Sequence, residues 1–454
     1  MSFGTGVQKK ALLFSLLLGL LPGGKAGAQI PVGEWQIAGP YPADRVNREA
    51  YPNFYAIFLA PWQTVTADGA GAVDLAEHIP PENSGGDLAI ARHVFWAAED
   101  AVVNLSLTYA GEVDLFFNGY KIFSGRRGGG FGPEGSTGGV DPGTGRPDLF
   151  PLYVKAGLNE IYLMASGGEG GWGFNVGTTE RLEPKEVHHG ATTELWSTEA
   201  VFLTSESVLK DPKRDLLYVT SFDNEFSQKP EPSGFISTLS LDGEVLDLKW
   251  IEGLHAPTGM DIWQDTLFVC EREHLLAIDL ASGAVAGRWE IPDPVFPNDL
   301  VIDDEGTIYI SDTRTGDWAD SRIYRFRDGR FDIFANEGIS RANGLWLHEG
   351  WLIVGSSGDG YLKKVELSTG RVERIISLGW GVIDGIRVDG QGNFLVSHWE
   401  GQLYRISPEG RILEILDAMP LGWNTADFEY LPEEGILLIP TFLDNRVRAL
   451  KIGS

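Results

Sequence analysis

The chain has 454 residues, a formal net charge of −28 and a single cysteine. This length allows two or three domains with sizeable hydrophobic cores. The negative charge argues against a surface for nucleic acid or an anionic membrane, because both attract clustered Lys and Arg. Since Cys270 is the only cysteine, no intramolecular disulfide can form, and its apolar neighbours at 267–269 predict a buried, unreactive thiol in a strand.

The first residues have the pattern of a secretory signal peptide. Lys9 and Lys10 precede an apolar run at 11–21, and small residues follow up to Ala28. A basic start, a short apolar core and an A-x-A-like end are typical of such peptides. The run is shorter than the roughly 20 residues of a membrane span, and no later segment reaches that length. We expect cleavage after Ala28, which removes residues 1–28. The mature protein would then be periplasmic or secreted. The alternative is that the segment is retained as an N-terminal anchor.

Residues 29–180 have the pattern of an antiparallel β domain. Asn118-Gly119 lies between two alternating segments, which is a strong hairpin signal. A glycine-rich loop follows at 125–145. The segments with strand-like character are 102–109, 113–117, 120–123, 150–154 and 160–164. Their spacing predicts a β-sandwich.

Residues 181–199 lack this alternation and are predicted to be a linker. The pair His188-His189 within this segment has two interpretations. The two side chains could ligate a metal, but adjacent side chains point in different directions in most backbones. We therefore expect a solvated loop there.

From residue 200 onward the chain repeats itself. One strand-like segment recurs six times, with central residues at 218, 268, 309, 353, 395 and 438. The spacings of 50, 41, 44, 42 and 43 residues, with several strands per unit, are typical of a β-propeller. A glycine-containing turn recurs in step, at Gly243, Gly283, Gly329, Gly370 and Gly410. We expect an all-β chain with a six-bladed propeller over residues 200–454.

A short motif precedes each of these central residues by ten to twelve positions and leads into an earlier strand. Because the innermost strands of a propeller run beside its central channel, we expect the equivalent positions to form a ring at one mouth. In chain order the ring holds Glu206, Thr258, Asn298, Asn343, Asp384 and Ala426. The repeat also separates two similar dipeptides: Asp384-Gly385 begins a strand, whereas Asp389-Gly390 is an ordinary turn.

Four ring positions carry a carboxylate or a carboxamide: Glu206, Asn298, Asn343 and Asp384. Such oxygen ligands suit Ca²⁺, Mg²⁺ or Mn²⁺, and Zn²⁺ also fits, although it prefers His or Cys. The pattern predicts one divalent ion on the propeller axis, with open positions for water or substrate. In the alternative interpretation, the Asn and Asp side chains only cap turns by accepting backbone N–H hydrogen bonds.

The segment 29–180 also resembles the galactose-binding-like jelly-roll family. The likeness rests on Trp35-Gln36-Ile37-Ala38-Gly39-Pro40, on the Phe117-Asn118-Gly119 turn and on Lys155-Ala156-Gly157-Leu158-Asn159-Glu160-Ile161. These motifs are loose and indicate a fold more than a ligand. Because many members bind carbohydrate, the resemblance implies a sugar-binding or a purely architectural domain.

Residues 200–454 resemble the senescence marker protein/gluconolactonase/luciferin-regenerating enzyme family of six-bladed propellers. The likeness rests on Glu206-Ser207, Phe296-Pro297-Asn298-Asp299, Ala342-Asn343-Gly344-Leu345 and Ile383-Asp384-Gly385-Ile386. It implies that Glu206, Asn343 and Asp384 ligate the metal, while Asn298 lies near the metal and helps to hold the substrate. Calcium and zinc both serve in the family, and calcium is our first expectation.

Family members with known activity hydrolyse lactones or, in related propellers, other esters. The resemblance therefore implies a metal-dependent hydrolase whose metal polarises the acyl carbonyl and stabilises the developing oxyanion. Asp384 is the candidate for activating water, as a general base or through water held by the metal. Sugar-lactonase members carry an arginine where this chain has Phe296. We therefore expect a less polar substrate.

Further candidates for the mouth are Asp312, Arg314, Trp380, His398, Trp399 and Asp427. Among them, Asp312, Trp380 and His398 join Asn298 and Phe296 in the expected substrate-binding set. His398 could instead be a hydrogen-bonded histidine at a strand end. Two other functions stay open, because propellers host many functions. One is a non-catalytic binding propeller with a structural ion, whose sandwich recognises carbohydrate or protein; the other is a lyase acting on a cyclic ester.

Overall fold

The computed structural model describes residues 30–42, 48, 62–79, 88–127, 147–167, 171–184, 192–223, 232–313 and 321–453. The expected signal peptide at 1–28, the pair His188-His189 and Arg314 lie outside these residues. Within the described ranges nearly every element is a β-strand, and the longest helix is α2 (Leu75–His78). The all-β prediction is confirmed. No helix in these ranges is long and apolar enough to cross a membrane.

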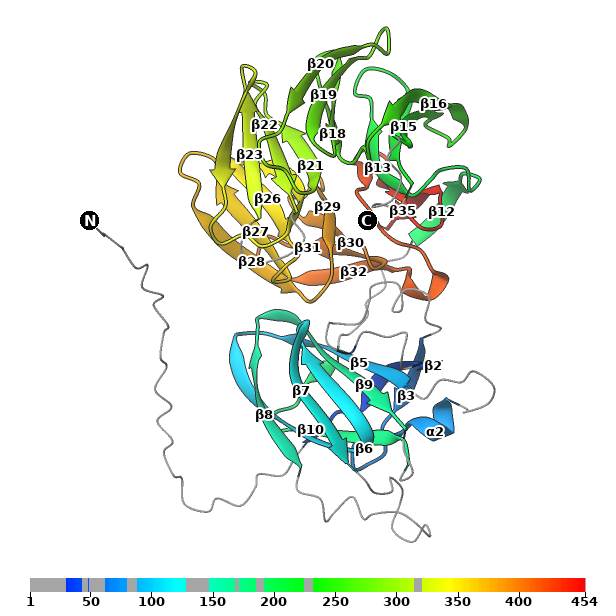
Figure 1. Cartoon of the computed structure of the whole chain (residues 1–454), viewed down its shortest axis with the longest axis vertical. Coiled ribbons are helices and arrows are strands. Elements are labelled where there is room, and N and C mark those ends of the chain that lie inside the picture. Colours follow the sequence, from blue (N-terminus) through cyan, green and yellow to red (C-terminus); the bar gives the residue numbers. More distant parts are fainter. Residues whose placement is uncertain are drawn as a thin grey trace, which may run out of the picture.

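Five separate four-stranded antiparallel sheets are arranged as a propeller-like ring (Figure 1). Their strands are β13 (Ser205–Lys210), β14 (Leu216–Ser221), β15 (Gly234–Ser240) and β16 (Val245–Leu254); β17 (Met260–Trp263), β18 (Thr266–Glu271), β19 (His274–Asp279) and β20 (Val285–Glu290); β21 (Pro297–Ile302), β22 (Ile308–Asp312), β23 (Arg322–Arg327) and β24 (Arg330–Ala335); β29 (Ile383–Val388), β30 (Phe394–His398), β31 (Gln402–Ile406) and β32 (Ile412–Asp417); and β33 (Glu429–Leu431), β34 (Ile436–Pro440), β35 (Val447–Ile452) and β12 (Thr192–Ser197).

The remaining repeat is not a separate sheet. It consists of β25 (Ala342–His348), β26 (Trp351–Ser356), β27 (Tyr361–Glu366) and β28 (Val372–Leu378). Its outer strand β28 pairs in parallel with β9 (Gly157–Ser166), so that these strands belong to a 15-stranded sheet. Of the six blades expected, five are therefore separate sheets, and the fourth repeat is not. The physical reason is that the open edge of β28 is paired with a strand from the N-terminal part.

The predicted repeat markers have the expected places in these sheets. The six recurring segments are the second strands of their repeats, β14, β18, β22, β26, β30 and β34. The five turn glycines all have positive φ, between 69° and 87°, which side chains rarely adopt. The first strands line the inside of the ring, where each contacts the next in the order β13, β17, β21, β25, β29 and β33, and β33 contacts β13 again. The starts of these strands therefore surround one axis.

The segment expected to be a linker contains two strands. β11 (Glu183–Pro184) pairs with β5 (Leu88–Ala97), and β12 pairs with β35 as the outermost strand of the last sheet. The chain before the first blade thus closes the ring against the end of the chain. The sequence did not indicate β12 because an outermost strand is exposed to solvent along one edge and one face. Such a strand needs no strict alternation of apolar and polar residues. In β12, for example, the apolar residue Leu195 is 48% exposed.

The N-terminal part is a set of mostly antiparallel strands built around one long strand. β6 (Ala101–Phe117) pairs through its first half with β8 and β10, and through its second half with β7 and β9. The separate strands expected at 102–109 and 113–117 are therefore one strand. The other strands are β1 (Ile30–Pro31), β2 (Glu34–Tyr41), β3 (Gln63–Thr66), β4 (Ala72–Asp74), β7 (Tyr120–Arg127), β8 (Asp148–Val154) and β10 (Gly173–Thr178).

The expected hairpin at Asn118-Gly119 is confirmed. These two residues join β6 to β7 with φ values of 47° and 83°. Positive φ at both central residues is the geometry that favours Asn-Gly in a two-residue turn. The larger apolar cluster of this part includes Trp35, Leu105 and Phe174, and a second cluster joins Leu88, Ile90, Phe116, Tyr162 and Met164 to Met419.

A buried histidine should make the N-terminal part sensitive to acid. Burial lowers the pKa of His93 from 6.5 to about 4, although its hydrogen bond to the Glu34 carbonyl oxygen opposes this shift. The folded pKa lies below the unfolded value, so the unfolded chain takes up the extra proton between these two pH values. The free energy of unfolding should therefore fall, by roughly 3 kcal/mol, as the pH drops from about 6.5 to about 4.

Urea unfolding of the wild type, His93→Gln and His255→Gln at several pH values between about 7 and 4 measures this contribution. His93→Gln should lose part of the pH dependence of the free energy of unfolding. His255→Gln should retain it, because His255 is exposed. An unchanged acid dependence in His93→Gln would contradict the assignment.

Candidate metal centre

A β-bulge begins four of the six inner strands. In β13, β21, β25 and β29, two residues oppose a single residue of the second strand. The four bulged pairs are Glu206-Ser207, Asn298-Asp299, Asn343-Gly344 and Asp384-Gly385. A bulge breaks the strand alternation locally and re-aims a side chain. The residues expected to ligate a metal are therefore the first residues of the four bulges.

Hydroxyl side chains hold three of these bulges in place. The second bulge residue donates its N–H to a hydroxyl on the opposing strand: Ser207 to Thr220 at 3.1 Å, Asp299 to Ser311 at 3.0 Å and Gly385 to Ser397 at 2.7 Å. Two of the hydroxyls also bond the next repeat, since Thr220 donates to the Thr258 carbonyl oxygen and Ser397 to that of Ala426. The hydroxyl groups of Thr220 and Ser397 thus hold a bulge in place and also connect it to the neighbouring repeat.

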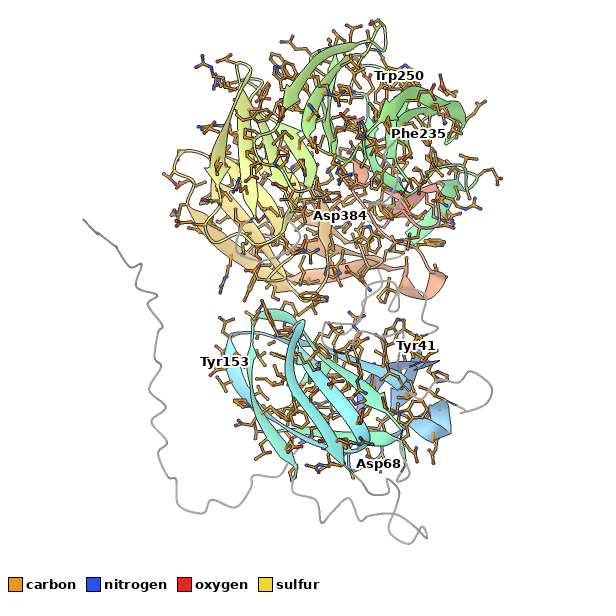
Figure 2. The ribbon with its side chains drawn as sticks, viewed as in Figure 1. Tyr41, Asp68, Tyr153, Phe235, Trp250 and Asp384 are labelled. Carbon is orange, nitrogen blue, oxygen red and sulfur yellow. The ribbon has the colours of Figure 1, made fainter. Side chains whose placement is uncertain are left out.

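The first residues of the bulges are buried, with exposed fractions of 4% for Glu206, 6% for Asn298, 2% for Asn343 and 3% for Asp384. Three of their oxygen atoms have no hydrogen-bond partner: Glu206 Oε2, Asn343 Oδ1 and Asp384 Oδ1. Figure 2 places Asp384 toward the centre of the ring of sheets. Buried polar atoms are rarely left unpaired, so a group at this position needs an explanation. These oxygen atoms fit a hard cation.

Both carboxylates at this mouth are in an unfavourable electrostatic environment. Burial raises the pKa of Glu206 well above its usual range, and the negative charges of Asp384, Asp427 and Asp299 raise it further. Burial also raises the pKa of Asp384, as do Asp427, Asp299 and Glu400, whereas a hydrogen bond from the Asn343 side chain opposes the shift. Removal of two carboxylates from water without a counter-charge is costly, so either protons or a cation must accompany them.

The remaining two ring positions do not contribute ligands. Thr258 donates its hydroxyl to the Pro297 carbonyl oxygen at 3.2 Å, which ties two neighbouring inner strands together. Ala426 is fully buried and apolar. The four ring positions with a carboxylate or carboxamide therefore coincide with the four bulges, and Thr258 and Ala426 do not.

A second layer of charge lies next to the ring, and the repeat reasoning missed it. Asp299 accepts hydrogen bonds from the backbone N–H groups of Leu300 and Leu345, both at 2.7 Å. Asp427, expected at the mouth, is buried and accepts from the Ser207 hydroxyl at 2.6 Å and from Arg387 at 3.3 Å. These carboxylates are satisfied by protein groups, unlike Glu206 and Asp384. Asp299 and Asp427 each directly follow a ring position in the sequence, and this placement is the signal that could have identified them.

Arg387 is the cation of this second layer. Its guanidinium is buried and lies 3.3 Å from Asp427 Oδ1 and 3.4 Å from Glu429 Oε1. Burial alone lowers the pKa of Arg387, but the charges of Asp427 and Glu429 raise it above the usual value. Arg387 thus compensates the negative charge of Asp427 and Glu429. In contrast, no cationic side chain is among the main interactions that shift the pKa values of Glu206 and Asp384.

The expected substrate-binding residues have different roles in the structure. Asp312 Oδ1 accepts the backbone N–H of Phe296 at 2.7 Å and also that of Val295 at 3.2 Å. This carboxylate therefore shapes the loop before Asn298 instead of facing a ligand. Trp399 is buried and packs edge-on against Phe442 with ring centroids 5.2 Å apart. Phe296 and Trp380 are half-buried.

His398 forms a dyad with Glu400, which the sequence analysis did not identify. His398 Nδ1 lies 2.9 Å from Glu400 Oε2, but both ring nitrogens of His398 are buried without a hydrogen-bond partner. Glu400 also accepts the backbone N–H of Val382 at 3.0 Å, two residues before Asp384. Glu400 therefore ties the loop that leads to Asp384, whereas the hydrogen-bonded histidine considered as an alternative for His398 is not seen.

Among the described residues, no group of three or more His, Cys, Asp or Glu side chains is arranged to hold a metal ion. A metal at the ring would need the Asn amide oxygens as well as the two carboxylates. Calcium sites commonly use such carbonyl oxygens. A separate cavity of about 570 Å³ lies at the far ends of the inner strands and is lined by Lys210, Asp261, Arg387 and Glu429.

Comparison with known proteins gives one family-model match, over part of the ring. Residues 253–426 match the family model described as SMP-30/Gluconolactonase/LRE-like region. The match contains Asn298, Asn343 and Asp384, while Glu206 precedes it. No curated protein matches this chain.

Among solved structures, a calcium-binding protein, regucalcin, from Agrobacterium tumefaciens is 17% identical, with a TM-score of 0.45; the alignment covers 59% of this chain and 95% of regucalcin. A catalytically inactive virginiamycin B lyase from Staphylococcus aureus with quinupristin is 10% identical, with a TM-score of 0.42, covering 58% of this chain and all of the lyase (100%). Identities at this level do not carry a function from one chain to another.

The hydroxyl that supports the Asp384 bulge should be important for stability. Ser397→Ala removes the acceptor for the Gly385 N–H and the donor to the Ala426 carbonyl oxygen, and all three groups are buried. We expect a loss of roughly 1–3 kcal/mol in the free energy of unfolding, because buried polar groups are left unpaired. Chemical denaturation measures it. Ser282→Ala is the control, since this exposed hydroxyl bonds only within its turn; equal losses would contradict the role of Ser397.

Proposed function

We propose that this protein is an exported, metal-dependent hydrolase that acts on a lactone or ester at the mouth of the propeller. Glu206, Asn343 and Asp384 would hold one divalent ion, and Asn298 would lie beside it. The observation that carries the proposal is the set of three buried oxygen atoms without hydrogen-bond partners, from three different inner strands. The family match over residues 253–426 supports the same assignment, because that family includes lactonases.

The charge of the ring supports a divalent cation. Glu206 and Asp384 are both buried, and their pKa values are raised by burial and by further carboxylates. An ion of charge +2 would neutralise these two groups and give each unpaired oxygen a partner. Since all the ligands are oxygen atoms, Ca²⁺ is the first choice, and Mg²⁺, Mn²⁺ and Zn²⁺ are the alternatives.

The bound metal would polarise the acyl carbonyl group of the substrate and stabilise negative charge on its oxygen atom. The chain's own residues would do the rest. Asp384 is the carboxylate placed to accept a proton from the attacking water, and Asn298 offers an amide to orient the acyl group. Phe296 and Trp380 give the mouth an apolar wall, which favours a substrate with few hydroxyl groups.

Three further assignments belong to this proposal. We take β25–β28 to act as the sixth blade of the propeller, because β25 contacts both β21 and β29 in the inner ring. Residues 29–180 would be the galactose-binding-like sandwich that the sequence predicts. The N-terminal residues 1–28 would direct the chain to the periplasm or out of the cell.

Metal binding tests the ring directly. Isothermal titration of Ca²⁺ or Mn²⁺ into chelator-treated protein should give about one ion per chain. Asp384→Asn removes one carboxylate ligand and should weaken binding by more than tenfold, roughly 1.4 kcal/mol or more. Asp389→Asn is the matched control, because Asp389 accepts hydrogen bonds from Gln391 and Asn393 within its own turn and lies 3.4 Å from Arg405, and it is not one of the ring positions. Absence of binding in the wild type, or equal loss in both variants, would refute the metal centre.

Hydrolysis requires its own test. Hydrolysis rates on a panel of lactones and aryl esters should be compared for chelator-treated and metal-loaded protein. We expect at least one substrate to be hydrolysed faster by the metal-loaded protein. Asp384→Asn should abolish the metal-dependent part. Binding of metal without any turnover across the panel would favour the non-catalytic propeller with a structural ion. Turnover unaffected by chelation would exclude metal-assisted hydrolysis.

A further inference from the structure

The segment that leads to Asp384 is held on one side by the N-terminal part of the chain. We propose that strand β9 and the β6–β7 turn position Asp384 for metal binding, so that the N-terminal sheets belong to the support of the metal centre and are not an independent module. The inference rests on the proposed metal centre. It assigns Gly119 and Leu158 as positioning residues, neither of which touches the metal or substrate.

The first contact is between backbones. Ser377 and Leu378, at the end of β28, pair in parallel with Gly157 and Leu158 of β9. The Ser377 hydroxyl donates to the Leu158 carbonyl oxygen at 3.0 Å. A Cβ at Gly157 would lie 2.3 Å from the Ser377 carbonyl oxygen, so the two backbones approach more closely than a side chain permits. This pairing fixes the chain six residues before Asp384.

The second contact is a shared hydrophobic core. Leu158 is 3% exposed and belongs to the same apolar cluster as Leu378, Ile383 and Ile386. Ile383 is the residue directly before Asp384, and it is fully buried. Val94 and Trp96, both in β5, pack against the same cluster. A side chain from the N-terminal part therefore belongs to the same apolar cluster as the residue directly before the proposed ligand.

The third contact is at the loop between β28 and β29. The ring of Trp380 lies directly against Gly119, because a Cβ at that glycine would be 2.0 Å from Cε3 of Trp380. Gly119 is the second residue of the Asn-Gly turn, with φ of 83°. The hairpin turn thus sets the position of Trp380, one of the walls of the mouth, and of Gly381 next to it.

The loop from Trp380 to Asp384 is short and tied on its other side as well. Val382 donates its N–H to Glu400 at 3.0 Å, and Ile383 donates to the Ser357 hydroxyl at 3.1 Å. Because both sides of this loop are held, a displacement of Trp380 or Leu158 should shift the few residues between Trp380 and Asp384. Outer partners of metal ligands typically change metal affinity by 10–100-fold when altered. The same range is expected here.

Gly119→Ala tests the turn, with Gly329→Ala as a matched control. Both glycines are the second residue of a two-residue hairpin turn, with φ of 83° and 76°, so an added Cβ strains both turns similarly. At Gly329 the nearest heavy atom to the new Cβ is 3.9 Å away, whereas at Gly119 the Trp380 ring must move. The full chain of Gly119→Ala should lose at least as much thermal stability as that of Gly329→Ala, because the Trp380 ring must also move. Only Gly119→Ala should weaken Ca²⁺ or Mn²⁺ binding, by about tenfold.

Leu158→Ala provides a second variant, which removes the apolar support behind Ile383. Its control is Leu276→Ala, since Leu276 is 1% exposed and belongs to a different cluster. Leu158→Ala should weaken metal binding about tenfold, and Leu158→Met should restore most of the affinity because it refills the space. Leu276→Ala should lower the melting temperature without a change in the dissociation constant beyond about twofold.

The outcomes separate this inference from the metal centre itself. If the wild type binds no ion, the proposed function fails, and the inference fails with it. If the wild type binds one ion and Asp384→Asn does not, the metal centre stands. In that case, unchanged affinity in both Gly119→Ala and Leu158→Ala, measured well below their melting temperatures, would overturn the positioning role.

Discussion

The two-residue bulge at the start of the inner strands is the constraint on which the site depends. It inserts one extra residue opposite Thr220, Ser311, Gly355 and Ser397, so that the side chain before it turns toward the axis. Where a hydroxyl opposes the bulge, it pairs the N–H that would otherwise be buried without a partner. Two of these hydroxyls, those of Thr220 and Ser397, also donate to a backbone carbonyl oxygen of the next repeat. Ring closure and ligand geometry are therefore two results of one local arrangement.

The two layers of carboxylates differ in what compensates their charge. Asp299 and Asp427 receive backbone, hydroxyl and guanidinium hydrogen bonds, and they brace the inner strands. Glu206 and Asp384 lack such compensation for at least one oxygen each. Stability alone favours the first arrangement, since an unpaired buried oxygen is costly. The contrast within a few residues of chain is the basis of the proposed metal centre.

The N-terminal sheets also change how the propeller is understood. A blade edge usually needs protection from pairing with another chain. Here β9 covers the edge of β28 and contributes Leu158 to the core behind Asp384. One pairing thus serves two purposes, since it protects an edge and supports the site. This explains why the ring consists of five separate sheets and a group of four strands inside a larger sheet.

Much of the architecture follows from sequence, because it repeats. The spacing of second strands and turn glycines predicted the sheets, and superposition of the repeats separated Asp384-Gly385 from the turn at Asp389-Gly390. A repeat argument averages over equivalent positions, so it cannot identify features that occur once. For that reason it missed β12 as the closing strand, Arg387 as a buried cation and the His398–Glu400 dyad.

The sequence by itself determined the all-β class, the repeat, and the four carboxylate and amide residues at one register. Only the tertiary structure decided which oxygen atoms remain unpaired, that Asp312 and Asp427 are already satisfied, and that β9 supports the loop before Asp384. The physical reason is that side-chain periodicity is local, whereas hydrogen-bond satisfaction and edge pairing depend on residues far apart in the chain.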